Sequence, residues 1–232
     1  MSNDVVGTAL LDFYNKNYTV DIIVKSSISE DDIISIPYLF RSLKELPKLE
    51  KKALSLCKGK VLDVGAGSGC HSIILKENGL AVTAIDVSKG AVEVMQKRGL
   101  KAENINFYDV TDKYDTLLFL MNGVGIAGTL DALKTFLSKA KSLLNDGGRI
   151  LLDSSDISYM FKEEDGSTWV DLNSSYYGEV TYQMQYKEMT TDKFDWLFVD
   201  FKTLSAKAKE VGFTAELVFE DENQQYLAQL SI

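Results

Sequence analysis

The sequence predicts an α/β fold with a mostly parallel sheet that helices cover on both faces. Three observations support this prediction. Apolar runs of strand length alternate with amphipathic segments of helix length between residues 60 and 153. One of these runs leads directly into a glycine-rich turn, and the next run ends on an acid. Such alternation indicates parallel strands joined by crossover helices.

The individual elements follow from the apolar periodicity and from the residues that break it. Before the alternating region, we predict a helix over 4–14, an extended segment over 18–22 and a helix that begins at Pro47, continues through Leu56 and ends near Gly59. Gly79 and Ser88 are suitable cap residues for two of the helices that follow. The alternating region contains predicted strands 60–64, 81–86, 103–107, 115–121 and 149–153, with helices 69–78, 88–98 and 129–144.

The pattern changes after Asp156. Apolar and polar residues alternate with a period of two over 179–187, which is typical of a strand with one wet face. Trp169 and Trp196 flank this alternating stretch, and we therefore predict an antiparallel insertion over 157–198. We expect the stripe of Tyr182, Met184 and Tyr186 in this strand to be core packing rather than a substrate site. The sequence then predicts a helix over 203–211 and strands over 214–220 and 225–232.

The segment from Val61 to Gly69, VLDVGAGSG, is the most informative motif. Its three glycines allow backbone conformations that side chains disfavour, and the N–H groups of the following helix point at whatever the turn holds. The spacing is G-x-G-x-G and not the G-x-G-x-x-G of dinucleotide-binding folds. Asp63 would repel a pyrophosphate but suits an ammonium or, through water, an amino-acid group.

A second acid, Asp86, ends the run AVTAID about 20 residues after the glycines, where a doubly wound fold places its ribose-binding carboxylate. An ionised carboxylate can accept hydrogen bonds from both ribose hydroxyls. Asp86 could also cap the helix that begins near Ser88. With NINFYDV at 104–110, YDTLLFLMN at 114–122 and GGRILLD at 147–153, the motif set covers residues 51–153.

In this order, the motifs resemble those of the class I S-adenosylmethionine-dependent methyltransferases. The resemblance implies a Rossmann-like sheet of seven strands in which the last strand is antiparallel, and S-adenosylmethionine as cofactor. It also implies that Val87 lies against the adenine ring and that Asp109 faces the adenine amino group. The predicted cofactor-binding residues are Asp63, Gly65, Ala66, Gly67, Gly69, Asp86, Val87, Asp109, Val110, Asn122 and Arg41.

Several of these residues have a second interpretation. Asp109 could be a loop acid, and Asn122 could be a turn residue before Gly123 rather than part of the pocket floor. Arg41 could bind the cofactor's carboxylate through two hydrogen bonds, or it could be a surface charge. Asp153 and Asp156 leave the fifth strand at the ligand edge and face either substrate or solvent.

The catalytic candidates are His71 and Tyr38. His71 is the only histidine and begins the helix after the glycine turn, although such a residue often serves packing or capping. Tyr38 lies in the N-terminal segment 1–50, which we predict to be a lid over a cofactor-binding domain that spans 51–232. Cys57 and Cys70 have neither metal-ligand spacing nor a disulfide pattern, so we predict no metal site.

Bulk properties narrow the acceptor class. The chain of 232 residues has a net charge of -9 and no marked Lys/Arg cluster, which disfavours nucleic acid as a partner. The segment after Leu120 also lacks the Pro-Pro-aromatic motif of enzymes that methylate DNA amino groups. No signal peptide or membrane span is evident, so we expect a cytoplasmic protein without a membrane partner. The sequence leaves the oligomeric state open.

The predicted function is methyl transfer from S-adenosylmethionine to a small-molecule acceptor. Two alternatives remain. A nicotinamide-dependent oxidoreductase would also use a glycine turn and Asp86, but Asp63 and the glycine spacing disfavour it. A non-catalytic S-adenosylmethionine-binding module fits the same motifs, because no catalytic base is evident in the sequence.

Overall fold

A computed structural model describes residues 4–161 and 176–232, and a seven-stranded sheet forms its core. The sheet order is β11-β12-β7-β6-β3-β4-β5. The strands from β7 to β5 pair in parallel, whereas β12 is antiparallel to both of its neighbours. This confirms the predicted fold class. The strands are β3 (Lys60–Val64), β4 (Ala81–Asp86), β5 (Ala102–Asn104), β6 (Tyr114–Phe119), β7 (Leu144–Ser155), β11 (Thr214–Glu220) and β12 (Gln225–Ser231).

Helices cover both faces of this core sheet. Neighbouring residues of β6 enter different layers: Leu117 packs in the cluster that includes the buried side chains of α5 and α6, and Leu118 in the cluster that includes those of α2 and α3. Both faces are therefore dry, as expected for a parallel sheet. No helix in the described part of the chain has the length and apolarity needed to cross a membrane. The helices are α2 (Lys48–Leu56), α3 (Cys70–Glu77), α4 (Lys89–Lys97), α5 (Leu130–Ser142) and α6 (Phe201–Glu210).

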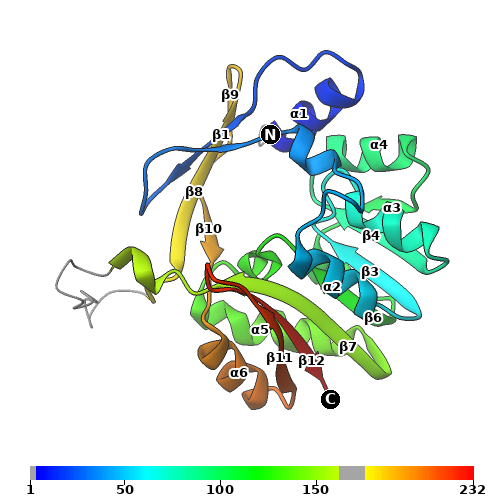
Figure 1. The fold of residues 1–232 in the computed structure, drawn as a ribbon, viewed down its shortest axis with the longest axis vertical. Coiled ribbons are helices and arrows are strands. Elements are labelled where there is room, and N and C mark those ends of the chain that lie inside the picture. Colours follow the sequence, from blue (N-terminus) through cyan, green and yellow to red (C-terminus); the bar gives the residue numbers. More distant parts are fainter. Residues whose placement is uncertain (1–3, 162–175) are drawn as a thin grey trace.

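A second, antiparallel sheet joins two parts of the chain that are far apart in sequence. Its order is β10-β8-β1-β2, and β9 pairs with β8. The strands are β1 (Ile22–Ser26), β2 (Asp32–Ile34), β8 (Glu179–Tyr186), β9 (Met189–Thr190) and β10 (Phe194–Leu197). Figure 1 shows this sheet standing beyond one end of the core strands. The N-terminal segment and the insertion, which the sequence predicts as separate additions, thus form a single sheet.

Close contacts attach this second sheet to the core. Helix α1 (Val5–Tyr14) packs beside α4 (Figure 1), and a Cβ at Gly90 would lie 2.5 Å from the backbone of Gly7. The Asp4 carboxylate accepts hydrogen bonds from the N–H groups of both glycines, so one side chain caps two helices. At the other side, a Cβ at Gly125 would collide with the indole of Trp196 in β10. Small residues therefore fix the position of the sheet.

Most predicted elements are present, with shifts at three places. The predicted strand 103–107 is shorter, because the Asn106 side chain accepts a hydrogen bond from Tyr108 N–H and a 3₁₀ turn, Phe107–Asp109, follows. Strand β1 begins where the predicted extended segment 18–22 ends. Strand β7 extends beyond the predicted 149–153 at both ends. Trp169 and part of the predicted insertion lie outside the described residues.

Candidate functional site

The glycine turn connects β3 to α3, and Asp86 at the end of β4 supports it. Gly65, Gly67 and Gly69 all have positive φ angles, 68°, 56° and 79°. The Asp86 carboxylate accepts a hydrogen bond from Gly67 N–H at 2.9 Å and another from Ser88 N–H at 2.8 Å. A Cβ at Gly67 would meet nothing within 4 Å. The turn therefore borders open space on the side where the sequence predicts a ligand.

A cavity of about 730 Å³ opens beside Asp86 and Val87. Val87 is 70% exposed, so its apolar side chain is accessible from this cavity. Burial raises the pKa of the Asp86 carboxyl, and the N–H donors of Ser88 and Gly67 oppose the shift. Asp109 is exposed at the end of its 3₁₀ turn, whereas Val110 packs its side chain in the core. Of the residues predicted around the nucleoside, Asp86 and Val87 line this cavity, and Asp109 and Val110 do not.

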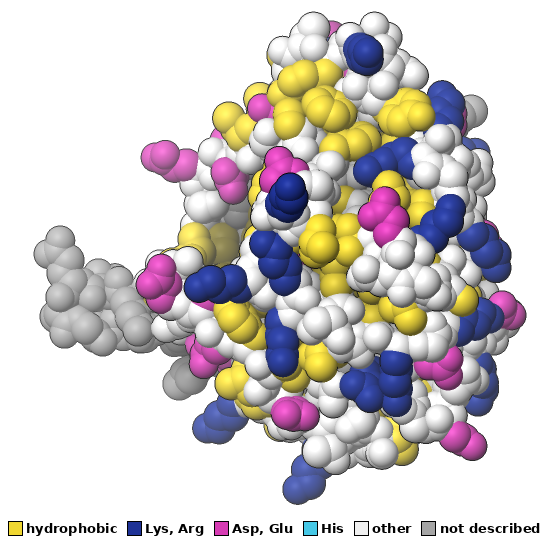
Figure 2. Space-filling view, turned by 45° about the vertical axis from the view of Figure 1, so that its right-hand side comes forward, with side chains coloured by type: hydrophobic (Ala, Val, Ile, Leu, Met, Phe, Trp, Pro, Cys, Tyr) yellow, Lys and Arg dark blue, Asp and Glu magenta, His cyan; other side chains and the backbone are white. Residues whose placement is uncertain are grey.

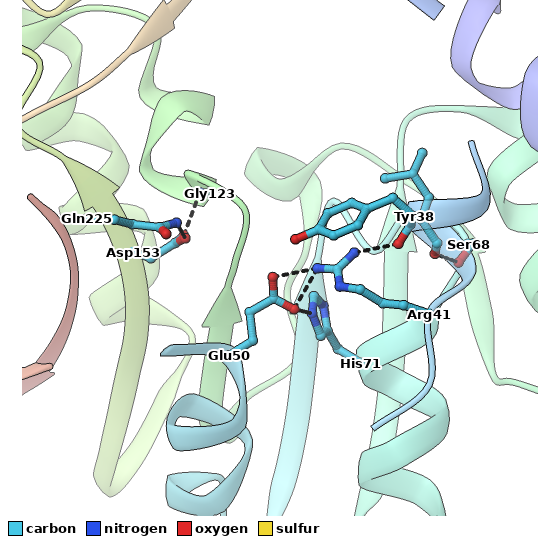
Figure 3. Close-up of polar contacts among 9 residues, drawn as sticks. Tyr38, Arg41, Glu50, Ser68, His71, Gly123, Asp153 and Gln225 are labelled. Carbon is cyan, nitrogen blue, oxygen red and sulfur yellow. Dashed lines mark hydrogen bonds and ion pairs between the residues drawn. The ribbon is translucent and has the colours of Figure 1, made fainter. Parts of the chain in front are cut away.

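Three buried charged side chains meet where α3 begins, directly after the glycine turn: Arg41, Glu50 and His71. Arg41 Nη2 lies 2.5 and 2.6 Å from the two carboxylate oxygens of Glu50, and His71 Nε2 lies 2.6 Å from Glu50 Oε2. All three residues are at most 5% exposed. Figure 3 shows Glu50 at the end of α2, His71 at the end of α3 and Arg41 on the segment before α2, with the Tyr38 side chain extending over Arg41. The Arg41 guanidinium carbon lies 4.0 Å from the centre of the Tyr38 ring.

The charge state of His71 follows from this group. Burial alone would lower the pKa of His71, but hydrogen bonds with Cys70 and Glu50 outweigh burial and raise it to about 10. Burial likewise opposes ionisation of Glu50, and its hydrogen bond with His71 and the nearby charges lower the Glu50 pKa nonetheless. His71 is therefore a cation at neutral pH. A cation cannot accept a proton, so this geometry suits positioning rather than base catalysis.

Arg41 is not the surface charge that the sequence left open as an alternative. Its side chain is buried, Nη1 donates to the Tyr38 carbonyl at 2.8 Å, and Nη2 is occupied by Glu50. Nε is buried and has no hydrogen-bond partner among the described residues. A buried donor without a partner carries a free-energy penalty, so this atom is suited to a ligand acceptor. A contact with a ligand through two nitrogens would compete with Glu50.

Glu50 is the site residue that sequence reasoning missed. An acid in the first turn of a helix is common on exposed surfaces, because it interacts favourably with the helix dipole. A signal was nevertheless present: Ala53 and Leu54, three and four residues later, are buried on the face that Glu50 shares. Asp63, which was predicted, is also buried and accepts a hydrogen bond from Ser72 Oγ at 2.6 Å. Burial raises its pKa, and the His71 charge opposes the shift.

The end of β6 forms the floor between the two sheets. Met121 and Asn122 both have positive φ angles, 63° and 57°, a strained arrangement that functional sites often contain. Asn122 Nδ2 donates to the Leu197 carbonyl at 3.1 Å, and Oδ1 accepts from Ser154 Oγ at 2.8 Å. Asn122 thus ties the core sheet to β10.

Asp153 faces neither substrate nor solvent. It is fully buried and accepts hydrogen bonds from Gly123 N–H and Gln225 Nε2, both at 3.2 Å (Figure 3). Burial raises its pKa to about 6. Asp156, by contrast, is half-buried and accepts a hydrogen bond from Tyr177 Oη at 2.8 Å. Both acids therefore support the local structure around the end of β7.

A second cavity, of about 290 Å³, lies between the second sheet and the end of β6. Tyr182 and Met184 of β8 line it together with Met121 and Asn122. Tyr186 is instead fully buried, with its hydroxyl donating to Asp12 at 2.9 Å. The predicted packing role of the stripe thus describes Tyr186, whereas Tyr182 and Met184 reach a cavity as well as the neighbouring cluster.

Comparisons with known proteins agree with this geometry. A family model described as a methyltransferase domain matches residues 57–202. A crystal structure of an S-adenosylmethionine-dependent methyltransferase from Bacteroides fragilis, in complex with S-adenosylhomocysteine, is 46% identical. The alignment covers 99% of this chain and 94% of that one, with a TM-score of 0.93.

Two further proteins are more distant. An uncharacterised methyltransferase from Staphylococcus carnosus is 28% identical over 168 residues, which is 62% of this chain and 78% of that protein. The CcbJ methyltransferase from Streptomyces caelestis shares the fold, with 12% identity, a TM-score of 0.60 and coverage of 83% and 97% of the two chains. From the fold, the matched domain and the Bacteroides fragilis relative, the chain belongs to the class I S-adenosylmethionine-dependent methyltransferase family.

Proposed function

We propose that this enzyme transfers a methyl group from S-adenosylmethionine to a small-molecule acceptor held in the cavity between the second sheet and the end of β6, which we call the acceptor cavity. The observation that carries the proposal is the position of this cavity, which joins the strained end of β6 to one face of the second sheet. Its volume of about 290 Å³ suits a metabolite or one group of a larger molecule. On the face drawn in Figure 2, basic side chains are interspersed with acidic and uncharged ones, which does not favour nucleic acid.

Three structural features fit the cofactor. Open space at Gly67 leaves room for a ligand close to the turn, the exposed Val87 offers an apolar contact for the adenine, and Arg41 Nε is a donor without a partner. We assign Asp86 to the ribose and Arg41 Nε to the carboxylate of the methionine portion. Gly65, Ala66, Gly67 and Gly69 form the turn beneath it, and Asp63, Asp109, Val110 and Asn122 remain proposed contacts. The Bacteroides fragilis relative, solved with S-adenosylhomocysteine, supports S-adenosylmethionine as the cofactor.

The bound cofactor supplies a methyl group on a sulfonium, which is already a good leaving group. The chain's own residues then have to orient the acceptor and exclude water. Alignment of two bound reactants can account for about 7–11 kcal/mol of a barrier. The rigid floor at Met121 and Asn122, held to β10 through the Leu197 carbonyl, serves this purpose. We propose that Tyr38 faces the reacting groups as a neutral hydroxyl, because burial raises its pKa.

The proposed lid role of residues 1–50 has a specific contact to support it. Ser68, inside the glycine turn, donates its hydroxyl hydrogen bond to the Leu39 carbonyl in the 3₁₀ turn Pro37–Phe40. Arg98 Nη1 donates to the Ser68 carbonyl at 2.6 Å and to its hydroxyl at 3.0 Å. These bonds couple the N-terminal segment to the cofactor turn. Movement of one is therefore expected to affect the other.

The function is tested by incubating the enzyme with labelled methyl donor and separate small-metabolite, RNA, DNA and protein fractions of a cell extract. Label in the small-metabolite fraction supports the proposal, and label confined to a macromolecular fraction contradicts it. Binding of S-adenosylhomocysteine without transfer to any fraction would favour the non-catalytic alternative. Tyr182→Leu serves as a matched variant: it should raise the KM for the acceptor while leaving S-adenosylhomocysteine affinity unchanged.

A further inference from the structure

One face of the second sheet is built as a recognition surface. Because side chains alternate along a strand, every second residue points to the acceptor cavity. The strand register places Ser26, Tyr182 and Phe194 in one row across β1, β8 and β10. Asp32, Val24 and Met184 form the next row, across β2, β1 and β8.

Aromatic rings dominate this surface. The ring centres of Tyr182 and Phe194 are 6.2 Å apart, and Trp196 lies 6.2 Å from Phe194 at an interplanar angle of 84°. Phe198, just after β10, adds a fourth ring 6.5 Å from that of Tyr182. All four residues line the acceptor cavity. Aromatic faces carry partial negative charge and attract cations, and several rings around one cavity are the usual receptor for an ammonium group.

The charge of the lining points in the same direction. Asp32 is the one charged side chain that lines the cavity in the described part of the chain, where no lysine, arginine or histidine does so. Asp32 Oδ1 accepts a hydrogen bond from Ile33 N–H at 2.7 Å, and Oδ2 has no hydrogen-bond partner among the described residues. The net charge of -9 adds to the preference for a cation. A carboxylate or phosphate acceptor would meet an acid and four aromatic rings without a positive partner.

Building on the proposed function, we infer that the acceptor is an amine with an apolar body, which binds as an ammonium ion over the rings of β8 and β10. Only the unprotonated amine reacts, so the ammonium proton must pass to water at the exposed rim beside Asp32 before transfer. The nitrogen lone pair then forms the new N–C bond, while the electron pair of the broken C–S bond stays on sulfur. The products are an N-methylammonium ion and S-adenosylhomocysteine.

The first test measures charge selectivity with three probes of nearly the same shape: choline, 3,3-dimethylbutan-1-ol and 3,3-dimethylbutanoate. Calorimetric titrations are made on the full-length enzyme saturated with S-adenosylhomocysteine. Choline should bind about tenfold more tightly than the neutral alcohol, and the carboxylate most weakly. Asp32→Asn should reduce this preference, and Asp31→Asn, an adjacent charge change outside the cavity lining, should not. Equal binding of the probes, or a preference that survives Asp32→Asn, overturns the inference.

The second test separates this inference from the proposed function. A small-metabolite extract is divided by ion exchange into cationic, neutral and anionic fractions, and each is incubated with labelled methyl donor and enzyme. Label in the cationic fraction supports an amine acceptor. Label in the neutral or anionic fraction overturns the amine but leaves the small-molecule function standing. Label only in macromolecules overturns both.

Discussion

Glu50→Gln is the sharpest perturbation of the site, because it neutralises the carboxylate that Arg41 and His71 share. The glutamine keeps one acceptor oxygen but points an NH2 group at a donor of a buried cation. Removing one partner of a buried ion pair typically costs about 3–5 kcal/mol. The His71 pKa gives a similar magnitude. A rise from 6.5 to about 10 corresponds to roughly 5 kcal/mol at about 1.4 kcal/mol per unit. The contribution of Cys70 to this rise would remain in the Glu50→Gln variant.

The sign of the pH dependence provides an independent check. In the native enzyme His71 keeps its proton up to a pKa of about 10, while in the unfolded chain it loses it near 6.5. The native state therefore binds more protons in this interval, and its stabilisation is complete below pH 6.5 and lost as the pH rises through 10. In Glu50→Gln, the contribution of Glu50 to the raised pKa of His71 is lost, so this pH-dependent stabilisation should be smaller. The difference in unfolding free energy between the two proteins should therefore narrow from pH 6.5 to pH 10.

Urea unfolding at several pH values measures this difference, with Glu77→Gln as the control. Glu77 is exposed on α3, so its neutralisation should change stability by less than about 0.5 kcal/mol. The reasoning would be refuted if Glu50→Gln lost less than about 1 kcal/mol at pH 7, or if its stability followed the same pH curve as the parent.

Four other predictions concern cofactor and acceptor. Asp86→Ala should weaken S-adenosylhomocysteine binding by about 1.5–3 kcal/mol in calorimetric titrations; an unchanged dissociation constant would contradict the ribose assignment. Gly67→Val should remain folded in thermal melts but lose binding, because the side chain would fill the open space and disfavour the positive φ; normal binding would exclude the turn as the site. Gly125→Ala should displace Trp196 and raise the acceptor KM while cofactor affinity is kept, and steady-state kinetics that show no change would rule out this coupling. Hydrogen exchange near Tyr38 should slow when S-adenosylhomocysteine binds, and equal rates with and without it would exclude the lid.

The core sheet and the arrangement of the glycine turn with Asp86 could be predicted from the sequence, because their signals are local. Strand, glycine turn and Asp86 follow one another within a single βαβ unit, so spacing alone places them together. Glu50 could not be assigned in this way, because its burial depends on Arg41 and His71 arriving from other elements. The chain periodicity also could not show that β8 pairs with β1. A period of two indicates that one face of the strand is covered, but it does not identify the element that covers it.

The pairing of β1 with β8 has a consequence for how the molecule is assembled. Ile23 and its partner Gln185 are 162 positions apart in a chain of 232 residues. Contacts of such sequence separation form late, because closing the intervening loop is entropically unfavourable. During synthesis β1 and its partner β2 emerge first, and the other edge of β1 remains unpaired until β8 follows. We therefore expect the glycine turn, whose contacts are local, to become competent for nucleoside binding before the acceptor cavity exists.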